Sequence, residues 1–223
     1  MTFADKVVNY LLNIDFNITL PAGITIIDPY KNAEVKRCVT VFYKNYFNDT
    51  NNRTYIYGIN PGRFGSGVTG IGFTDPVALQ IFCSIENSLG KKRELSSEFI
   101  YALIERYGGC EKFYSNFYIT SLSPLGFLKD SKNYNYYDNT LLQNAVEPFI
   151  TSSITTQLKF GANKNVAICL GKKNADYLGE LNTTHHFFKK IITLEHPRFI
   201  MQYRRKSVNT YIEKYLAAFE ENR

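Results

Sequence analysis

Hydrophobic residues along the chain recur in two patterns, one with the spacing of helices and one in short continuous runs. Apolar residues three and four positions apart, and the helix-start pair Asp75-Pro76, are typical of helices with one buried face. They predict helices over residues 4–13, 33–47, 75–89, 97–107, 140–160, 173–181 and 208–221, with Pro148 interrupting the fifth. Short runs rich in β-branched and aromatic residues predict strands over 55–59, 113–120, 166–170 and 191–194.

The alternation of these helices and strands is typical of a parallel sheet with helices on both faces. The predicted fold class is therefore α/β, a three-layer α/β/α sandwich around a central four-stranded parallel sheet. Neither a repeat nor a linker-like stretch divides the sequence, so residues 1–223 are expected to form a single domain. In such sheets ligands bind beyond the carboxyl ends of the strands, which directs attention to the loops 60–72, 121–127 and 196–206.

Composition narrows the class of protein without identifying a function. Hydrophobic residues make up 44% of the chain, which excludes disordered and collagen-like classes. No apolar run reaches the roughly 18 residues of a membrane span, and the first residues lack the basic leader and apolar block of a signal peptide. The 4 cysteines are scattered without the paired spacing of a zinc site. We therefore expect a cytoplasmic protein with no membrane partner and no metal.

The positive charge of the chain is localised. There are 26 basic and 20 acidic residues, a formal net charge of +6. Between His186 and Lys206 the only acidic residue is Glu195. The basic residues of that segment are Lys189, Lys190, Arg198, Arg204, Arg205 and Lys206. Such a cluster is either a solvated face or a surface for an anionic partner, and charge alone leaves both interpretations open.

The glycine-rich loop matches two phosphate-binding patterns only superficially. Residues 65–70 have the spacing of the dinucleotide-binding fingerprint, but that motif requires a helix that opens directly on its glycines. Here the strand is predicted to end near Ile59 and the next helix to begin at Asp75. Lys91 and Lys172 follow glycines, but neither is followed by the Ser or Thr of a Walker loop.

The same loop begins with a turn directly after a predicted strand, in the sequence Gly58-Ile59-Asn60-Pro61-Gly62-Arg63-Phe64-Gly65. Asn, Pro and Gly are common turn residues, so a purely structural turn is one interpretation. The several glycines between Gly62 and Gly72 favour another, because glycine lets the backbone approach a ligand closely. Phe73 then supplies a flat apolar surface beside the loop.

These residues resemble the first motif of the uracil-DNA glycosylase superfamily, most closely of its single-strand-selective monofunctional (SMUG-type) branch. That motif reads Gly-Met-Asn-Pro-Gly-Pro-Phe-Gly, continues through Thr-Gly and reaches a Phe, which here is 73 − 60 = 13 residues after the Asn. Matching residues are Gly58, Asn60, Pro61, Gly62, Phe64, Gly65, Thr69, Gly70 and Phe73. Ser123-Pro124-Leu125 and His196-Pro197 resemble the two further motifs of the family. All three follow predicted strands, which makes the resemblance specific.

The resemblance implies a base-excision-repair DNA glycosylase that hydrolyses the N-glycosidic bond of a base flipped out of DNA. Asn60 would position the attacking water, and a neutral His196 would donate a hydrogen bond to the departing base. Gly62, Phe73 and Ser121 would bind the base, with Phe73 as the stacking surface. The first and middle motifs contain no lysine, so the enzyme is expected to be monofunctional and to need no cofactor. From the residues alone, a core Phe73 and a structural His196 are the alternatives.

The partner that the resemblance implies is single- or double-stranded DNA containing a damaged base. The protein is expected to bind it as a monomer, and in a bacterium it would be associated with the nucleoid. The chain after His196 combines apolar residues with cations, which suits a wedge that fills the gap of a flipped nucleotide beside phosphate contacts. The expected DNA-binding residues are Arg63, Ser66, Pro197, Arg198, Phe199, Arg204, Arg205 and Lys206. An amphipathic start to the last helix is the alternative for Met201 and Tyr203.

The chain departs from the family at positions that affect specificity. Ser121 lies three residues before Pro124, where the family has an Asn that reads the uracil edge with both a donor and an acceptor. One hydroxyl cannot make this bidentate contact. We therefore expect specificity that is relaxed or shifted from uracil toward xanthine or hypoxanthine, with slower uracil excision. Arg63 and Ser66 replace a Pro and a Met, which makes the loop more polar.

Two other functions remain open at this point. A non-catalytic nucleic-acid-binding module could have the same fold, because a fold alone does not establish activity. Such a module would have little need for Asn60, Phe73 and His196 together. An enzyme acting on free nucleosides would in turn have no use for the basic segment.

Overall fold

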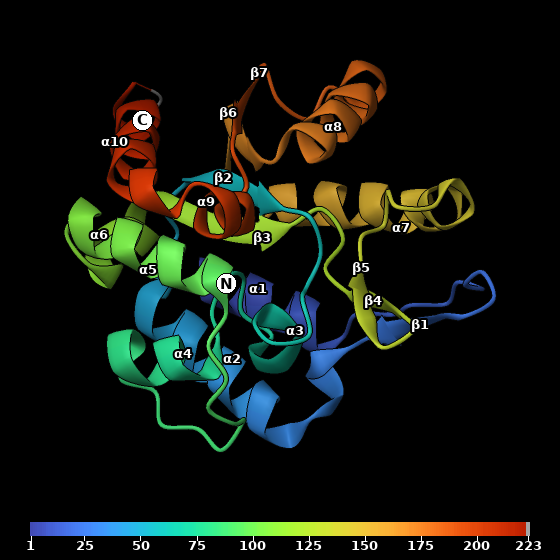
Figure 1. Ribbon diagram of the computed structural model, residues 1–223, viewed down its shortest axis with the longest axis horizontal. Coiled ribbons are helices and arrows are strands. Elements are labelled where there is room, and N and C mark those ends of the chain that lie inside the picture. The colour runs from blue at the N-terminus through green and yellow to red at the C-terminus, as the bar shows by residue number, and fades with distance from the viewer. Residues whose placement is uncertain (222–223) are drawn as a thin grey trace.

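The computed structural model describes residues 1–221 and contains the expected parallel sheet (Figure 1). Its strands are β2 (Arg53–Gly58), β3 (Phe117–Ser121), β6 (Ala162–Leu170) and β7 (Lys190–Leu194). All neighbours are parallel, in the order β3-β2-β6-β7. Every residue of β2 is buried, because this strand has a neighbour on each side and helices on both faces. The α/β fold with a four-stranded parallel sheet is thus confirmed, and residues 222 and 223 of the expected domain lie outside the described residues.

Helices connect and cover these strands. They are α1 (Phe3–Leu12), α2 (Ala33–Tyr46), α3 (Ser66–Thr69), α4 (Pro76–Cys83), α5 (Leu95–Tyr107), α6 (Cys110–Asn116), α7 (Thr140–Leu158), α8 (Lys172–His185), α9 (Pro197–Tyr203) and α10 (Val208–Glu220). Short 3-10 helices lie at Pro29–Lys31 and Arg205–Ser207. Among residues 1–221, no helix combines the length and hydropathy needed to cross a membrane.

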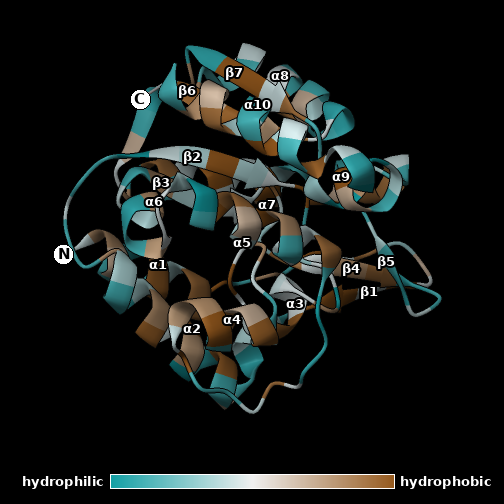
Figure 2. Ribbon diagram, turned by 60° about the vertical axis from the view of Figure 1, so that its left-hand side comes forward, coloured by the Kyte–Doolittle hydropathy of each residue, from teal (hydrophilic) through white to brown (hydrophobic). Residues whose placement is uncertain are grey.

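Alternating side chains of the strands point to the two faces of the sheet, where they pack against the helices of the outer layers. Tyr118 of β3 packs against Phe3 of α1 with ring centroids 5.2 Å apart, and its neighbour Phe117 packs on the opposite face against Phe219 of α10, at 4.5 Å. Gln157 of α7 lies on the same face as α1, where its backbone carbonyl accepts a hydrogen bond from the hydroxyl of Tyr55. Hydrophobic residues from α1 through α10 form one continuous core. Brown, hydrophobic segments mark β1, β7 and much of α2 and α4 in Figure 2.

Several predicted elements have different bounds, and helix α3 lies in the loop where no helix was expected before Asp75. Residues 113–116 are not strand but the end of α6, because Phe113 and Phe117 are also four residues apart, and a short apolar run does not separate strand from helix. Helix α4 ends at Cys83 instead of residue 89, since Ser84 adopts a left-handed conformation with φ +54°. Pro148 does not interrupt α7, because it lies on an exposed side where water can satisfy the freed carbonyl.

A second, antiparallel sheet was not predicted. Its strands are β1 (Ile24–Ile27), β4 (Gly126–Lys129) and β5 (Lys132–Tyr134), in the order β1-β4-β5. The hairpin between β4 and β5 turns at Asp130 and Ser131, both with positive φ. That conformation is usual for two-residue hairpins but normally carries Asn-Gly or Asp-Gly, so the sequence signal is absent. The strands of three or four residues are also too short for a clear alternating pattern.

A buried cation fastens the amino-terminal segment to the sheet. Arg53, only 1% exposed, lies over the rings of both Phe3 and Phe47, 4.7 and 4.8 Å from their centroids. Its Nε donates to the Tyr114 carbonyl at 2.7 Å, and its Nη2 donates to Asp49 Oδ2 at 2.7 Å. This hydrogen bond holds the pKa of Asp49 below its usual value. One guanidinium therefore connects α1, the segment after α2, β2 and α6.

We expect Arg53→Met to lower the free energy of unfolding by about 3 kcal/mol, because the Tyr114 carbonyl and Asp49 lose their buried donor. Urea denaturation followed by circular dichroism measures this loss. Arg106→Met is the matched control, since the Arg106–Glu213 ion pair is exposed on both sides. Equal stability of the two variants would contradict the structural role of Arg53.

Candidate active site

A cavity of about 450 Å³ lies at the carboxyl edge of the parallel sheet. Parallel strands all end at this edge, so the loops after β2, β3 and β7 meet there. The expected site residues that line the cavity are Asn60, Gly62, Arg63, Ser66, Phe73, Ser121, His196 and Arg198. Lining residues that were not expected are Ile59, Phe64, Glu94, Ser96, Lys132, Asn133 and Asn135. The three predicted loops therefore do converge on one site.

Phe73 forms one wall of the cavity beside His196. Its ring is 8% exposed, and its centroid lies 5.6 Å from that of the imidazole at an interplanar angle of 46°. The ring also lies against Gly58 at the end of β2, where an added Cβ would be 2.6 Å from Phe73 Cε2. Only a glycine at position 58 leaves room for the ring.

The loop that carries Phe73 is fixed by residues of the first motif. Helix α3 ends at Gly70 in a left-handed conformation with φ +73°, where a side chain would overlap Tyr30 and Val35. The hydroxyl of Thr69 donates to the Thr74 carbonyl at 2.6 Å and so closes the loop around Phe73. These contacts give a structural reason for the Thr-Gly pair within the motif.

The side-chain amide of Asn60 is held by the backbone at the end of β5 and just after it. Its Nδ2 donates to the Tyr134 carbonyl at 3.2 Å, and its Oδ1 accepts from the Tyr136 N–H at 3.2 Å. A primary amide has two N–H donors and an oxygen with two lone pairs. One donor and one lone pair of Asn60 are therefore oriented but still available to a ligand in the cavity.

His196 is a neutral imidazole with a defined tautomer. It caps α9, and its Nδ1 accepts a hydrogen bond from the Arg198 N–H at 3.2 Å. Because Nδ1 is the acceptor, the proton of the neutral ring lies on Nε2. Burial lowers the pKa of His196 to about 4, and the positive charge of Arg198 acts in the same direction. At neutral pH the cavity therefore faces an uncharged hydrogen-bond donor.

Ser121 and the β4-β5 hairpin complete the wall. Ser121 is 8% exposed and pairs with Gly58 across the sheet, and its hydroxyl has no hydrogen-bond partner among residues 1–221. Asn133 accepts a hydrogen bond from the Arg63 N–H at 3.0 Å, so the hairpin also supports the loop after β2. The hairpin residues that line the cavity were not predicted, because the strands of the second sheet have no recognisable sequence pattern.

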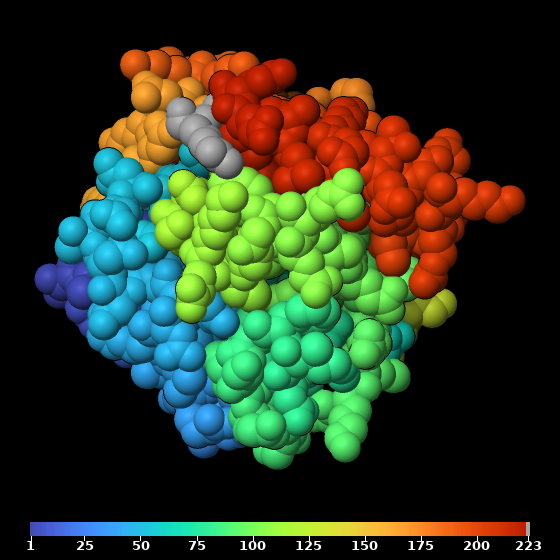
Figure 3. All heavy atoms as spheres, turned by 90° about the vertical axis from the view of Figure 1, so that its left-hand side faces the viewer, coloured from blue at the N-terminus to red at the C-terminus, as the bar shows by residue number. Residues whose placement is uncertain are grey.

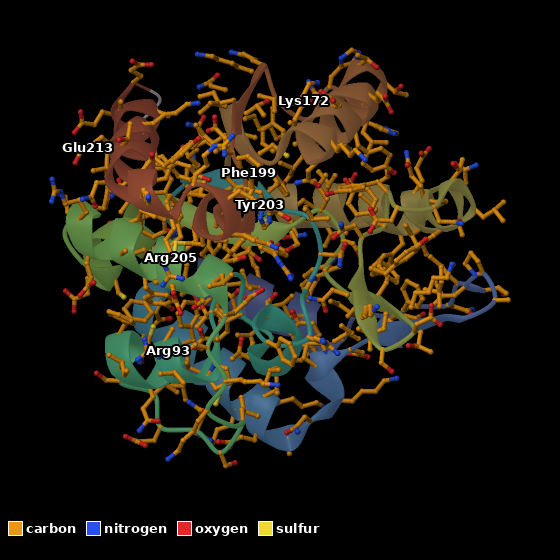
Figure 4. All side chains as sticks on the ribbon, in the orientation of Figure 1. Arg93, Lys172, Phe199, Tyr203, Arg205 and Glu213 are labelled. Carbon is orange, nitrogen blue, oxygen red and sulfur yellow. The ribbon has the colours of Figure 1, made fainter. Side chains whose placement is uncertain are left out.

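The basic segment after the cavity has a defined arrangement on α9. Phe199 and Tyr203 are 40% and 61% exposed, with ring centroids 5.6 Å apart, and Arg204 lies over the Phe199 ring. Figure 4 shows both aromatic residues and Arg205 on the side of the molecule that α9 occupies, and Figure 3 shows the red C-terminal segment projecting there. Arg205 and Lys206 are exposed, and Arg205 lies 3.7 Å from Glu98.

Two residues of α9 are buried in the protein and not at the DNA-binding surface. One was predicted to contact DNA and the other was a possible wedge residue. Pro197 is buried at the first position of α9, and Met201 is 9% exposed. Met201 and Tyr203 belong to α9, which the 3-10 turn at 205–207 separates from α10. They are therefore not the start of the last helix, which was the alternative interpretation. The exposed residues of α9 are thus Arg198, Phe199, Gln202 and Tyr203.

Residues 44–220 match the family model of the Uracil DNA glycosylase superfamily. The chain belongs to this superfamily and is a DNA glycosylase of DNA repair. It is similar over its whole length to a solved SMUG2. The crystal structure of wild-type SMUG2 from Pedobacter heparinus has a TM-score of 0.96 and 48% sequence identity, covering 99% of this chain and 98% of that one. A search of curated proteins finds no match.

We expect Gly58→Ala to reduce glycosylase activity and to cost about 1–3 kcal/mol of stability, because the new methyl group overlaps the Phe73 ring. Excision assays and thermal unfolding measure the two effects. Gly179→Ala is the control, since a Cβ at this α8 position meets nothing within 4 Å. A Gly58 variant as active and stable as the Gly179 variant would show that the ring has more room than the structure indicates.

Proposed function

We propose that this glycosylase is monofunctional and hydrolyses the N-glycosidic bond of a deaminated base in DNA, with uracil, xanthine and hypoxanthine as candidate bases. The convergence of Asn60, Phe73 and His196 on one cavity carries the proposal. A non-catalytic module would have no reason to combine an oriented amide, a stacking surface and a neutral donor. A monomer that acts as a single domain is part of the same proposal.

In the proposed reaction the flipped base stacks on Phe73 with one carbonyl oxygen directed at His196. Cleavage of the bond between C1′ and the base nitrogen leaves an oxocarbenium-like sugar and puts negative charge on the base. The Nε2–H of His196 donates to the oxygen that gains this charge. Because the histidine remains neutral, it stabilises the charge without transferring a proton.

Asn60 is the residue that orients the nucleophile. Its remaining N–H and lone pair can hold one water molecule below the sugar, and the oxygen of that water forms the new bond to C1′. The water proton is released to solvent, and the departing base takes up a proton. Asn60 has no ionisable proton near neutral pH, so it contributes orientation and not general-base catalysis.

The exposed face of α9 and the adjoining cations form the proposed DNA grip. Two exposed aromatic side chains in contact, with their rings tilted by 45°, are unusual on a free surface, and the pair lies next to Arg198 on the cavity wall. Phe199 and Tyr203 would fill the gap left by the flipped nucleotide. Arg63, Ser66, Arg198, Arg204, Arg205 and Lys206 would contact phosphates, which predicts binding that weakens with salt.

We expect Asn60→Ala and His196→Ala each to lower the excision rate by about 10²–10³-fold, the usual cost of losing one oriented group at the reacting centre. The assay is alkali-developed cleavage of labelled single- and double-stranded oligonucleotides containing uracil, xanthine or hypoxanthine. His185→Ala, which changes an exposed histidine at the end of α8, is the control. Equal product from all the proteins would overturn the site assignment.

The same assay tests the monofunctional mechanism. Lys132 lines the cavity and is the lysine that a Schiff-base mechanism would require. We expect strand breaks only after alkali. Breaks that form without alkali and disappear in Lys132→Ala would contradict monofunctional hydrolysis.

We expect Ser121→Asn to raise uracil excision by about tenfold relative to xanthine, because the amide adds both a donor and an acceptor for the uracil edge. Single-turnover rates on matched oligonucleotides give this ratio. Ser121→Ala, which removes the hydroxyl, is the opposing control. A wild-type enzyme that is strictly specific for uracil at ordinary rates would disprove relaxed specificity.

A further inference from the structure

Glu94 presents a carboxyl group to the cavity that the proposed reaction does not use. Its backbone N–H donates to Asp75 Oδ2 at 2.9 Å, while Asp75 Oδ1 accepts from the N–H groups of Val77 and Ala78 at 2.9 and 2.8 Å. The Asp75 carboxylate thus fixes the starts of α4 and α5 relative to each other. Glu94 occupies the N-cap of α5, but its side chain makes no capping hydrogen bond.

The Glu94 side chain extends instead over the glycines of the first motif. Its Oε1 lies 3.3 Å from the position that a Cβ of Gly62 would take, and a Cβ on Gly65 would overlap Oε2. A residue larger than glycine at position 65 would therefore displace the carboxyl group. The spacing of these glycines gives Glu94 its place in the cavity wall.

This carboxyl group has no hydrogen-bond or ion-pair partner among residues 1–221, although Arg198 lines the same cavity. Burial raises the pKa of Glu94 to about 7, with Arg198 opposing the shift and Asp75 adding to it. Glu94 is half-buried, so its unpaired carboxyl group is held in the cavity wall and stays accessible to a ligand. An unpaired carboxyl in a substrate cavity is therefore a candidate for ligand recognition.

We propose that Glu94 is a specificity-determining residue that reads the polar edge of the flipped base in its neutral acid form. Its carbonyl oxygen would accept from a ring N–H, and its hydroxyl would donate to the adjacent base carbonyl. Uracil, xanthine and hypoxanthine all carry a ring N–H beside a carbonyl. Glu94 would thus supply the paired donor and acceptor that Ser121 alone lacks. The inference rests on the proposed function, since it requires a deaminated base in this cavity.

Protonation makes this role testable. As pH rises through about 7, Glu94 ionises, loses its donor and places a negative charge near the base that gains negative charge in the reaction. The rate should therefore be highest below this pKa and fall above it. The charged and titratable groups around Glu94 are Asp75 before α4, Arg63 after β2, Lys132 on β5, and His196 and Arg198 at the start of α9. The pKa of His196, at about 4, keeps its titration outside this range.

The experiment measures single-turnover excision of uracil from a single-stranded oligonucleotide between about pH 6 and pH 8.5, because uracil keeps its ring N–H there. Wild type should lose about tenfold in rate for each pH unit above the Glu94 pKa. In Glu94→Gln, the amide keeps a donor and an acceptor but does not ionise. We expect its rate to stay within about threefold of wild type at low pH and to remain flat as pH rises. Glu94→Ala should lose at least about tenfold at low pH.

Two variants separate recognition from folding and from general charge effects. Glu105→Gln removes an exposed carboxylate from the same helix and should keep the wild-type profile. Gly65→Ala leaves Glu94 chemically intact but displaces it, and should reproduce the loss of Glu94→Ala. Thermal unfolding identifies a variant that fails to fold, in which case the isosteric Glu94→Gln profile decides.

A wild-type pH profile retained in Glu94→Gln, or an alanine variant within about twofold of wild type, would overturn the role of Glu94 while leaving the glycosylase reaction in place. Absence of product from wild type on uracil, xanthine and hypoxanthine would overturn the proposed function and this inference with it. Hypoxanthine excision that depends on Glu94 as uracil excision does would support a shared edge contact.

Discussion

The close approach of Phe73 to Gly58 is the contact on which the candidate site depends. At the carboxyl end of β2, the missing side chain lets an aromatic ring lie against the sheet, and this ring becomes a wall of the cavity. The Gly58 carbonyl accepts hydrogen bonds from the Leu122 N–H at 3.0 Å and from Asn174 Nδ2 at 3.1 Å. Those bonds connect the loop after β2 to the loop after β3 and to α8. A change at Gly58 therefore affects the stacking surface and its two supporting elements together.

The charge states in the cavity follow from burial rather than from residue type alone. His196 is neutral because burial and Arg198 both disfavour a second proton, while burial raises the pKa of Glu94 toward neutrality. In the proposed reaction, this arrangement places hydrogen-bond donors without full charge around a base that becomes negative. The basic residues after α9 lie at the surface, where they suit phosphates. The segment from His196 to Lys206 thus carries a neutral imidazole in the cavity and cations at the surface.

Most elements of the parallel sheet were predictable because the strands contain short apolar runs and the longer helices have a periodic apolar face. The motif residues Asn60, Phe73 and His196 were identified through their resemblance to the family motifs, which occur in order after predicted strands. The start of β3 was misplaced because Phe113 and Phe117 satisfy helical as well as strand spacing. The antiparallel sheet was missed because its hairpin turns at Asp130 and Ser131, which lack the usual glycine.

The sequence by itself determined the class of fold, the motifs and the loops that carry them, because these depend on local periodicity and on spacing along the chain. Only the tertiary structure decided that Glu94, Asn133 and the backbone after β5 border the same cavity, and that Pro197 and Met201 lie inside. Glu94, Asn133 and the backbone after β5 are distant in sequence from the motifs they support, and hydrophobic periodicity does not predict such contacts. The burial of Pro197 and Met201 depends on how α9 packs against the rest of the chain. The protonation states of His196 and Glu94 were decided in the same way, since burial depends on packing by the whole chain.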